Sequence, residues 1–531
     1  MSTSSSYSPE NCSLEPYSTE ELDRCVELLE SFVEDRTLLT TMDRATRVRL
    51  LTAAGRLSRP TRDESRRTAK AFRKKERKHV VAHDRDATAS TEIRTARRAD
   101  VYVAPPQLVS GVGADAREQP RELLQPRDCY ICKQPFRRLH FFYDAMCPSC
   151  AELNYAKRFQ TASLTGRTAL ITGARIKIGF QAALMMLRAG ARVLVTTRFP
   201  RDAAARFARE SDFAKWQGRL EVFGLDLRHA PSVEIFARFI SQTEPRLDIL
   251  VNNAAQTVRR PAAFYAHLLD GEHRAFAELP AAVQSVLLRH EQCKAEMSLE
   301  GERALAAPRS AAAPGPTGFV AWRGDGPGVG IRSSAMLSQI PCAYDDAMRD
   351  HELFPAGRSD ADLQQVDLRE TNSWRLTLGD VPSPEMLEVQ LVNAVAPFIL
   401  CSKLKPLMTR DRTNEKHIVN VSAVEGQFSR RTKTERHPHT NMAKAALNMM
   451  TLTSAPDYAA SGIFMNAVDT GWVTDEDPMA LSRRKQTIHD FQPPLDIVDG
   501  AARVCDPFFS GLLTGTHVWG KFLKDYAPTE W

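Results

Sequence analysis

The sequence predicts an α/β protein built on a doubly wound parallel sheet. Within Leu164–Gly190, a short apolar run at Thr168–Ile171 is followed by a Thr-Gly turn and then by an amphipathic stretch that begins near Ile178. This order is typical of a strand, a tight turn and a helix. Further apolar runs follow with helical patterns between them, at Arg192–Thr197, Arg219–Gly224 and Asp248–Val251. Strands that alternate with helices favour a parallel sheet covered on both faces.

The regions of the chain differ in composition. Residues 1–17 are polar and rich in Ser, which predicts a disordered tail, and residues 18–110 are predicted to be helical and basic. A small module with paired cysteines is expected at 125–156. The sheet domain then occupies 164–531 and is interrupted by an insert at about 258–383.

The basic region is predicted to hold two short helices and a charged stripe. Ser18 and Glu21 have the spacing of a capping box, which predicts a helix that starts there. A second helix is expected over Asp43–Ala54, with Gly55 ending it. Arg56–Lys78 then carries eleven Lys and Arg side chains against three acidic ones. Such a stripe could bind nucleic acid or an acidic surface. We favour a solvent-exposed helix, because no known nucleic-acid-binding motif accompanies the charge.

Four cysteines form two CxxC pairs with 14 residues between the pairs. Each pair can present two thiolates to one tetrahedral ion, so two pairs fill the four positions of a zinc site, as in a zinc ribbon. Because four protein ligands close the coordination sphere, we expect a structural zinc ion rather than a catalytic one. His140 could replace one ligand, and two redox-active CxxC motifs are the alternative interpretation. The predicted zinc ligands are Cys129, Cys132, Cys147 and Cys150.

The composition favours a globular protein of a reducing compartment. The 531 residues are 43% hydrophobic with a formal net charge of +6, which names no partner by itself. The cysteines outside the CxxC pairs are scattered, so we expect buried thiols and a cytoplasmic location rather than a disulfide framework. No apolar run approaches the roughly 18–20 residues that a membrane span needs. The polar N-terminus predicts no secretory signal.

Several short motifs resemble the short-chain dehydrogenase/reductase family. They are TGARIKIG after the first strand, Asp226-Leu227 after the third and NNAA at Asn252–Ala255 after the fourth. Together they imply a dinucleotide whose pyrophosphate binds at the helix N-terminus after the glycine turn. Lys177 stands where the family has its middle glycine. The resemblance assigns cofactor binding to Gly173, Arg175, Lys177, Ile178, Gly179, Arg198, Asp226, Leu227, Asn253, Ala254, Lys444 and Thr474.

The second half of the chain resembles the catalytic half of the same family, with two departures. A predicted helix carries Asn393, which resembles the asparagine that kinks this helix and holds a water in the family's proton relay. Lys444 lies four residues after Thr440, which is the spacing of the family's Tyr and Lys pair. Thr440 therefore replaces the catalytic tyrosine. Ala423, next to Ser422, replaces the serine that orients the substrate carbonyl.

The replaced tyrosine leaves the predicted site without its usual proton donor. A threonine hydroxyl is far too weak an acid for that role, whereas a phenol with an unperturbed pKa of about 10 can be tuned by a nearby lysine. His437 and His439 lie just before Thr440 and could substitute, or they could be ordinary loop residues. Tyr265 and Tyr344 of the insert are other candidates. The predicted catalytic set is Asn393, Lys444, Thr440, Ser422 and His439.

The insert delays the next helix of the family pattern until about Glu385. Pro261–Cys293 has helical patterns, whereas Ala304–Gly330 is rich in Ala, Pro and Gly, which predicts flexibility. Leu353–Asp380 is polar and irregular. In a doubly wound sheet the segments after the strand C-termini border the ligand crevice. We therefore expect the insert to cover or line the substrate site, with an outer decoration as the alternative.

These observations predict an NADP(H)-dependent oxidoreductase that acts on a C=O or CH–OH group of a small molecule with an altered proton donor. NADPH is preferred over NADH, because no carboxylate follows the second strand at Thr196–Arg198, and Arg175 and Lys177 add positive charge. The rival hypothesis is a catalytically silent NADP(H)-binding sensor or scaffold. A nucleic-acid-associated protein is a weaker alternative. The sequence leaves NAD as cofactor and a homo-oligomer open.

Overall fold

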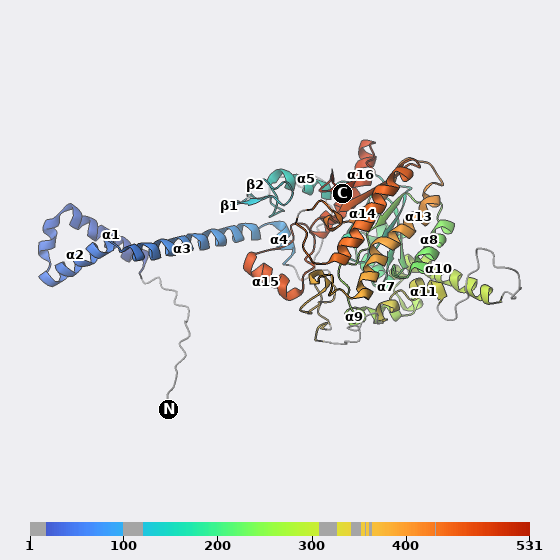
Figure 1. Ribbon diagram of the computed structural model, residues 1–531, viewed down its shortest axis with the longest axis horizontal. Coiled ribbons are helices and arrows are strands. Elements are labelled where there is room, and N and C mark those ends of the chain that lie inside the picture. The colour runs from blue at the N-terminus through green and yellow to red at the C-terminus, as the bar shows by residue number, and fades with distance from the viewer. Residues whose placement is uncertain are drawn as a thin grey trace, which may run out of the picture. The chain divides into compact units, whose positions relative to one another are not determined.

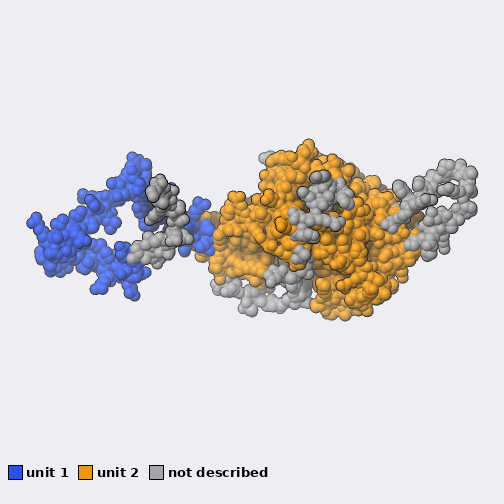
Figure 2. All heavy atoms as spheres, turned by 90° about the horizontal axis from the view of Figure 1, so that it is seen from below, with its two compact units in different colours: residues 1–82 blue, residues 83–531 orange. Residues whose placement is uncertain are grey.

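The structure is a computed structural model, and it describes residues 17–98, 121–306, 326–340, 352–355, 357–360, 364–430 and 432–531. Two compact units divide the chain, residues 1–82 and residues 83–531 (Figure 2). The larger unit holds the sheet, the paired cysteines and every site residue predicted above that the structure describes.

The smaller unit consists of helices whose side chains are largely exposed. Its elements are α1 (Thr19–Glu34), a 3-10 turn (Arg36–Thr41), α2 (Arg44–Ser58) and the first part of α3 (Arg62–Ala89). The predicted capping box of Ser18 and Glu21 is confirmed. The prediction that Gly55 ends the second helix is wrong, because α2 continues through it. A glycine inside a helix costs only about 1 kcal/mol relative to alanine, so it does not by itself stop one.

The basic stripe Arg56–Lys78 is divided between two helices. Its first residues end α2, and after Arg59–Thr61 the rest lies in α3. All of its side chains except that of Ala69 are exposed. This exposure agrees with the solvent-exposed helix that we favour, while binding of nucleic acid stays a prediction.

Eight strands form the central sheet of the larger unit in the order β10-β9-β8-β7-β6-β3-β4-β5 (Figure 1). The strands are β3 (Thr168–Thr172), β4 (Arg192–Thr197), β5 (Leu220–Gly224), β6 (Ile249–Asn252), β7 (Lys416–Ser422), β8 (Ile463–Asp469), β9 (Phe522–Lys524) and β10 (Ala527–Thr529). Neighbouring strands are parallel except β9 and β10. Chain order reverses between β3 and β6, and such a switch point is where open α/β sheets bind ligands. The predicted doubly wound sheet is confirmed.

Helices cover both faces of this sheet (Figure 1). They are α6 (Lys177–Arg188), α7 (Pro200–Ala208) and α16 (Ile497–Thr514) on one face, and α8 (Ala230–Thr243), α13 (Ala396–Met408) and α14 (Pro438–Ala459) on the other. Successive strand residues point to opposite faces. Ile171 therefore packs in the first core and its neighbour Leu170 in the second. Both residues are fully buried, which explains the continuous apolar runs in the sequence.

One helical run, Ser383–Met408, is long and apolar enough to cross a membrane by length and composition. The expectation that no stretch of the chain is long and apolar enough for a membrane span is therefore wrong. Half of the most apolar part of this run is buried inside the protein. Leu400, Leu404 and Leu407 pack in the second core. The run therefore has the environment of a core helix of the sheet domain.

The described parts of the insert contain one long helix, two shorter ones and several 3-10 turns. They are α9 (Ala262–His273), α10 (Ala281–Ala306), α11 (Val329–Arg332) and 3-10 turns at Phe276–Glu278, Gly326–Gly328, Met336–Gln339 and Ser373–Arg375. Helix α10 packs on β5 and α7 and buries Val286 and Leu287 in the first core. Of the stretch Ala304–Gly330, residues 304–306 end α10, and residues 326–330 lie in the 3-10 turn Gly326–Gly328 and in α11. The flexibility of this stretch stays a prediction. Residues 307–325 lie outside the described part of the chain.

The paired cysteines lie in a small module that shares a core with the sheet domain. Its elements are α4 (Glu92–Ala96), β1 (Glu122–Asp128), β2 (Pro135–Arg138) and α5 (Pro148–Arg158). Strands β1 and β2 pair antiparallel. Phe142 and Tyr143 of the module pack with Val473 and Leu495 of the sheet domain. The module and the sheet therefore form one body.

Candidate active site

A cavity of about 1470 Å³ opens at the C-terminal ends of the parallel strands. Typical small-molecule sites measure roughly 300–1,000 Å³, so this one has room for a dinucleotide together with a substrate. All twelve residues predicted to bind the cofactor border it. Of the predicted catalytic residues, Ser422, Thr440 and Lys444 border it, whereas Asn393 and His439 do not.

The glycine turn between β3 and α6 has a left-handed backbone at two positions. The φ angles are 69° at Gly173 and 56° at Lys177. That conformation costs a residue with a Cβ roughly 1–2 kcal/mol, so Lys177 keeps the turn's shape at some strain. Gly179 is required by a close approach, since an added Cβ would lie 2.4 Å from Nδ2 of Asn253. That amide donates to the carbonyls of Thr172 and Gly173 at 3.0 and 3.1 Å and holds the turn against the NNAA segment.

Two arginines lie at the end of β4, where the cofactor's ribose is expected. Arg175 forms an ion pair with Asp202 of α7 at 2.8 Å. Arg198 donates to the hydroxyl of Tyr265 at 2.7 Å. Both guanidinium groups lie near the ring of Phe199, 5.5 and 5.7 Å from its centre. Tyr265 belongs to the insert, so the insert lines this end of the cavity.

Asp226 borders the cavity, but its carboxylate is already paired. Burial alone would raise the pKa of this carboxyl, and the ion pair with Arg228 at 2.7 Å holds it below the usual value instead. Arg228 also pairs with Glu388 at 2.9 Å. The N–H of Asp226 donates to the carbonyl of Gly330 at 2.8 Å. Asp226 therefore links the end of the third strand to the insert, in addition to any contact with a cofactor.

Lys444 is buried beside the end of β7, one helical turn after Thr440 on α14. Its ammonium donates to the carbonyl of Val421 at 2.8 Å. Burial lowers the pKa of Lys444 to about 8, although the charges of Glu425 and Asp469 oppose this shift. Lys444 is therefore a largely protonated cation at neutral pH, placed at the wall of the cavity.

The helix before β7 is interrupted by a π turn at Leu391–Val395, between α12 (Ser383–Gln390) and α13. Asn393 lies in this turn. Its Oδ1 accepts the N–H of Gln256 at 2.7 Å, and its Nδ2 donates to the carbonyl of Gln256 at 3.0 Å. The π turn lies where the family resemblance predicts a kink. The side chain fixes the backbone that follows the NNAA segment.

Two family models match the chain, one on each side of the insert and each extending into one end of it. The one described as short chain dehydrogenase matches residues 167–269, and the one described as Enoyl-(Acyl carrier protein) reductase matches residues 373–493. The chain belongs to the short-chain dehydrogenase/reductase family.

Known proteins resemble this family member over different lengths. Dehydrogenase/reductase SDR family member 13 of Bos taurus is 46% identical over 96 residues, which is 18% of this chain and 24% of that protein. Uncharacterized protein R665 of Acanthamoeba polyphaga mimivirus is 29% identical over 394 residues, 72% of this chain and 71% of that protein. The solved NADPH-bound carbonyl reductase from chicken fatty liver is 15% identical, with a TM-score of 0.40, over 71% of this chain and 98% of that one. The match with the bovine relative thus covers only about a quarter of that protein.

The resemblance to the family predicts that two hydroxyls of its catalytic set are replaced here, at Thr440 and Ala423. Thr440 stands at the tyrosine position, and its hydroxyl donates to the carbonyl of Thr257 at 3.4 Å. Ala423 has no polar group at the serine position. The adjacent Ser422 does not replace it, because its hydroxyl donates to Asn448 of α14 at 2.5 Å. The cavity wall thus holds Lys444, while alanine and threonine occupy the two positions at which the resemblance predicts serine and tyrosine.

The two histidines before Thr440 lie in different environments. His437 borders the cavity and stacks on Trp374 of the insert at 3.9 Å, with its Nδ1 donating to the Trp374 carbonyl at 3.0 Å. His439 is buried, with Nε2 3.5 Å from the Thr440 hydroxyl and 4.0 Å from Glu385. Burial lowers the pKa of His439 to about 4, so its ring is neutral at pH 7. This geometry does not support His439 as the proton donor.

The structure describes one of the two tyrosines offered as substitutes. Tyr265 is bonded to Arg198 at the end of β4. Tyr344 lies outside the described residues.

Asp469 is the site residue that the sequence reasoning misses. It ends β8, borders the cavity and pairs in register with Ser422 of β7. Its Oδ1 accepts the N–H of Gly471 at 3.1 Å. Burial raises the pKa of Asp469 to about 6, although Lys524 opposes this shift. The signal in the sequence is a carboxylate that closes the apolar run Ile463–Val468.

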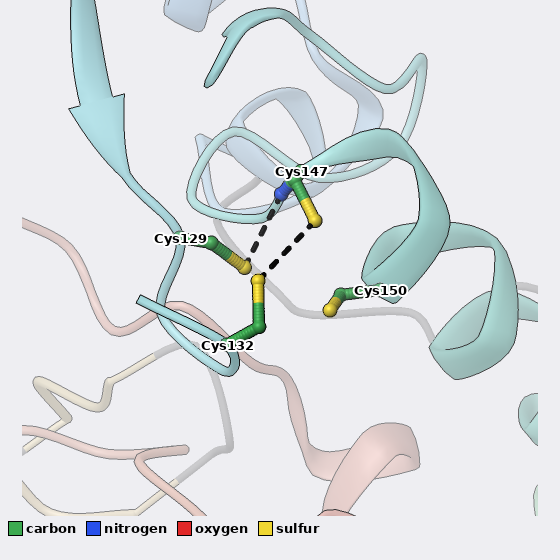
Figure 3. Close-up of side chains that lie close together, drawn as sticks. All are labelled: Cys129, Cys132, Cys147 and Cys150. Atoms are coloured by element: carbon green, nitrogen blue, oxygen red, sulfur yellow. Dashed lines mark hydrogen bonds between the residues drawn. The ribbon is translucent and has the colours of Figure 1, made fainter. Parts of the chain in front are cut away.

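The four predicted zinc ligands converge on one point of the cysteine module (Figure 3). Their sulfur atoms all lie within 4.8 Å of one another, and those of Cys132 and Cys147 are 3.7 Å apart. Thiolates bound 2.3 Å from a tetrahedral zinc ion lie about 3.8 Å apart, so the spacing fits zinc. His140 is not part of the group, because its Nδ1 accepts the N–H of Phe142 and its Nε2 faces Glu152 at 3.5 Å. The alternative of His140 as a ligand is therefore not supported.

Proposed function

We propose that this protein is an NADP(H)-dependent oxidoreductase that exchanges a hydride with a C=O or CH–OH group of a small molecule. The observation that carries the proposal is Lys444, which is buried at the wall of a cavity that also contains the left-handed glycine turn. Retention of both features is expected of a protein that binds a nicotinamide dinucleotide.

The residues of the cavity fit that group. The N-terminus of α6 borders the cavity, and the first turn of a helix suits a pyrophosphate. The missing Cβ of Gly179 allows the close approach of Asn253. By family resemblance, Lys444 holds the ribose hydroxyls of the nicotinamide and Thr474 contacts its carboxamide. The bound cofactor supplies or accepts the hydride.

The charges at the end of β4 favour NADP(H) over NAD(H). An NAD-selective site uses a carboxylate on the ribose hydroxyl, whereas an arginine suits the 2′-phosphate. Arg198 occupies the end of β4, and the nearby Asp202 is already paired with Arg175 and Arg206 at 2.8 and 2.7 Å. Asp202, the carboxylate nearest to Arg198 in the sequence, is therefore neutralised by two arginines.

We assign the proton exchange to Asp469. Its carboxyl borders the cavity beside the strand end where the family has its serine, and its pKa of about 6 lies near neutrality. An acid works best when its pKa is close to the working pH. His437 is the alternative, since it also borders the cavity, but its Nδ1 is engaged with Trp374 and burial lowers its pKa.

Two variants separate these donors in an assay of NADPH oxidation with a panel of aldehydes and ketones. Asp469→Asn is expected to lower turnover by roughly 10²–10⁴, the usual effect of a lost general acid, and to remove the limb of the pH profile near 6. His437→Gln is expected to keep that limb. The opposite pattern assigns the proton to His437.

The second candidate is a catalytically silent NADP(H) sensor, which is favoured by Ala423 and Thr440 at the serine and tyrosine positions. Saturable NADPH binding without turnover of any carbonyl would support it. In that case Thr440→Tyr combined with Ala423→Ser is expected to create reductase activity.

We also propose a structural zinc ion at the four cysteines, because their spacing fits four thiolate ligands. A cytoplasmic location stays a prediction.

A further inference from the structure

The cysteine module reaches the cofactor cavity through its first metal-binding turn. Tyr130 lies inside the first CxxC pair and borders the cavity together with Lys133. The hydroxyl of Tyr130 accepts a hydrogen bond from the N–H of Trp472 at 2.9 Å. The N–H of Tyr130 donates to the carbonyl of Ala145, close to the second CxxC pair, at 2.9 Å. One aromatic side chain therefore connects the cysteine cluster to the loop after β8.

That loop, Gly471–Thr474, is enclosed between the module and the cavity. Gly471 has a φ of 75°, and a Cβ added there would lie 2.5 Å from Leu495 and 3.2 Å from the hydroxyl of Tyr130. The side chain of Val473 is buried in the core of the module. All four residues of the loop border the cavity. The module thus sets the shape of one cavity wall.

Buried polar contacts prevent the module from moving independently of the sheet domain. Arg158 of α5 forms ion pairs with Asp496 and Asp499 at the start of α16, at 2.7 and 2.8 Å. Arg503 of α16 donates to Asn154 of α5 at 2.6 Å. All five side chains are buried. A change at the cysteines is therefore transmitted to the loop rather than absorbed by a hinge.

We propose that Tyr130 is a positioning residue for the cofactor. Its hydroxyl holds Gly471–Thr474 in the shape that receives the nicotinamide, and the metal-bound cysteines on either side fix Tyr130 in turn. This inference rests on the proposed function, in which Thr474 contacts the nicotinamide. It makes the affinity for NADPH depend on the metal in the module, although the metal takes no part in the chemistry.

The first test compares two Tyr→Phe variants of the module. Tyr130→Phe keeps the ring but loses the acceptor of the Trp472 N–H, and a lost neutral hydrogen bond is expected to weaken NADPH binding about two- to tenfold. Tyr155→Phe is the matched control, because Tyr155 packs on Phe141 at a ring distance of 4.9 Å and does not border the cavity. It is expected to bind NADPH as the wild type does. Both variants should retain their zinc.

The second test removes the metal from the full-length wild type with a chelator and restores it with zinc. We expect weaker NADPH binding and faster amide hydrogen exchange of Gly471–Thr474 in the metal-free protein, and recovery of both with zinc. In Tyr130→Ala, chelation should change the exchange of this loop less than it does in the wild type, because only the packing of Val473 in the core of the module still connects the two.

The outcomes distinguish the inference from the proposed function. If the wild type binds NADPH and Tyr130→Phe and Tyr130→Ala bind it equally well, Tyr130 does not position the loop, and the proposed function is unaffected. If the wild type does not bind NADPH, the proposed function fails. The hydrogen exchange of Gly471–Thr474 then still decides whether Tyr130 and the metal hold the loop, and unchanged exchange overturns that role.

Discussion

Asp469 has a pKa that predicts a measurable effect on stability. Burial raises this pKa from 3.8 to about 6, so between these values the folded protein binds more protons than the unfolded chain. The free energy of unfolding therefore falls as pH rises through this window and stays lower above it. Asp469→Asn removes the buried charge and can still accept the N–H of Gly471. We expect it to stabilise the protein by about 1–3 kcal/mol above pH 6 and to have little effect below pH 4.

Thermal unfolding of the wild type and Asp469→Asn at pH 4 and pH 7.5 checks this prediction. If the difference in stability between Asp469→Asn and the wild type is the same at both pH values, the carboxyl of Asp469 titrates normally and the prediction is wrong. If Asp469→Asn is more stable than the wild type but turns over more slowly, the Asp469 carboxyl serves the reaction at a cost in stability.

Arg198 predicts the cofactor preference. A charge-assisted hydrogen bond to a 2′-phosphate contributes about 1.5–3 kcal/mol, so Arg198→Ala is expected to weaken NADPH binding roughly ten- to a hundredfold. NADH, which lacks the phosphate, should be affected much less. Arg209→Ala is a suitable control, because Arg209 is exposed and does not border the cavity. Equal losses for NADPH and NADH in a titration would contradict this role of Arg198.

Single residues also show where sequence reasoning succeeds and fails. The replacements at Thr440 and Ala423 are visible from motif spacing alone, because the family supplies the positions. The buried pKa values are not visible, since His439 and Asp469 differ from ordinary loop residues only through tertiary burial. The pairing of Asp226 with Arg228 could have been suspected from their spacing, whereas its link to the insert could not.

At the scale of elements, the strands are the best predicted features. Predicted and observed boundaries of β4 agree, and those of β3 and β5 differ by one residue. Continuous apolar runs define buried parallel strands well. Helix ends are less certain, as α2 shows by continuing through Gly55. In the insert, the helical pattern over Pro261–Cys293 agrees with α9 and the first part of α10. The packing of α10 on β5 and α7 could not be predicted, because it is a contact between segments far apart in the sequence.

The cysteine module predicts one zinc ion per chain. Elemental analysis of the purified protein should find that stoichiometry, and Cys147→Ser should lower the zinc content. Because the core of the module is shared with Val473 and Leu495, we expect this variant also to unfold at a lower temperature. A full complement of zinc in Cys147→Ser, or zinc-free wild type with unchanged folding, would refute the site.

At the scale of the whole molecule, the fold could be predicted because alternating apolar and amphipathic segments specify a doubly wound sheet. The participation of the cysteine module in the cavity could not, because it depends on contacts between Tyr130 and Trp472, which are far apart in the sequence. The larger unit thus combines a family core with two additions, the module and the insert, and both contribute residues to the cavity wall.

The central claim is that the cavity binds NADP(H) through Lys444. The most direct measurement is a titration of the full-length protein with NADPH, carried out in parallel on Lys444→Ala. We expect saturable binding at one site per chain for the wild type and a large loss of affinity in the variant, which removes the buried ammonium from the wall. Absence of saturable binding by the wild type, or equal binding by Lys444→Ala, would contradict the claim.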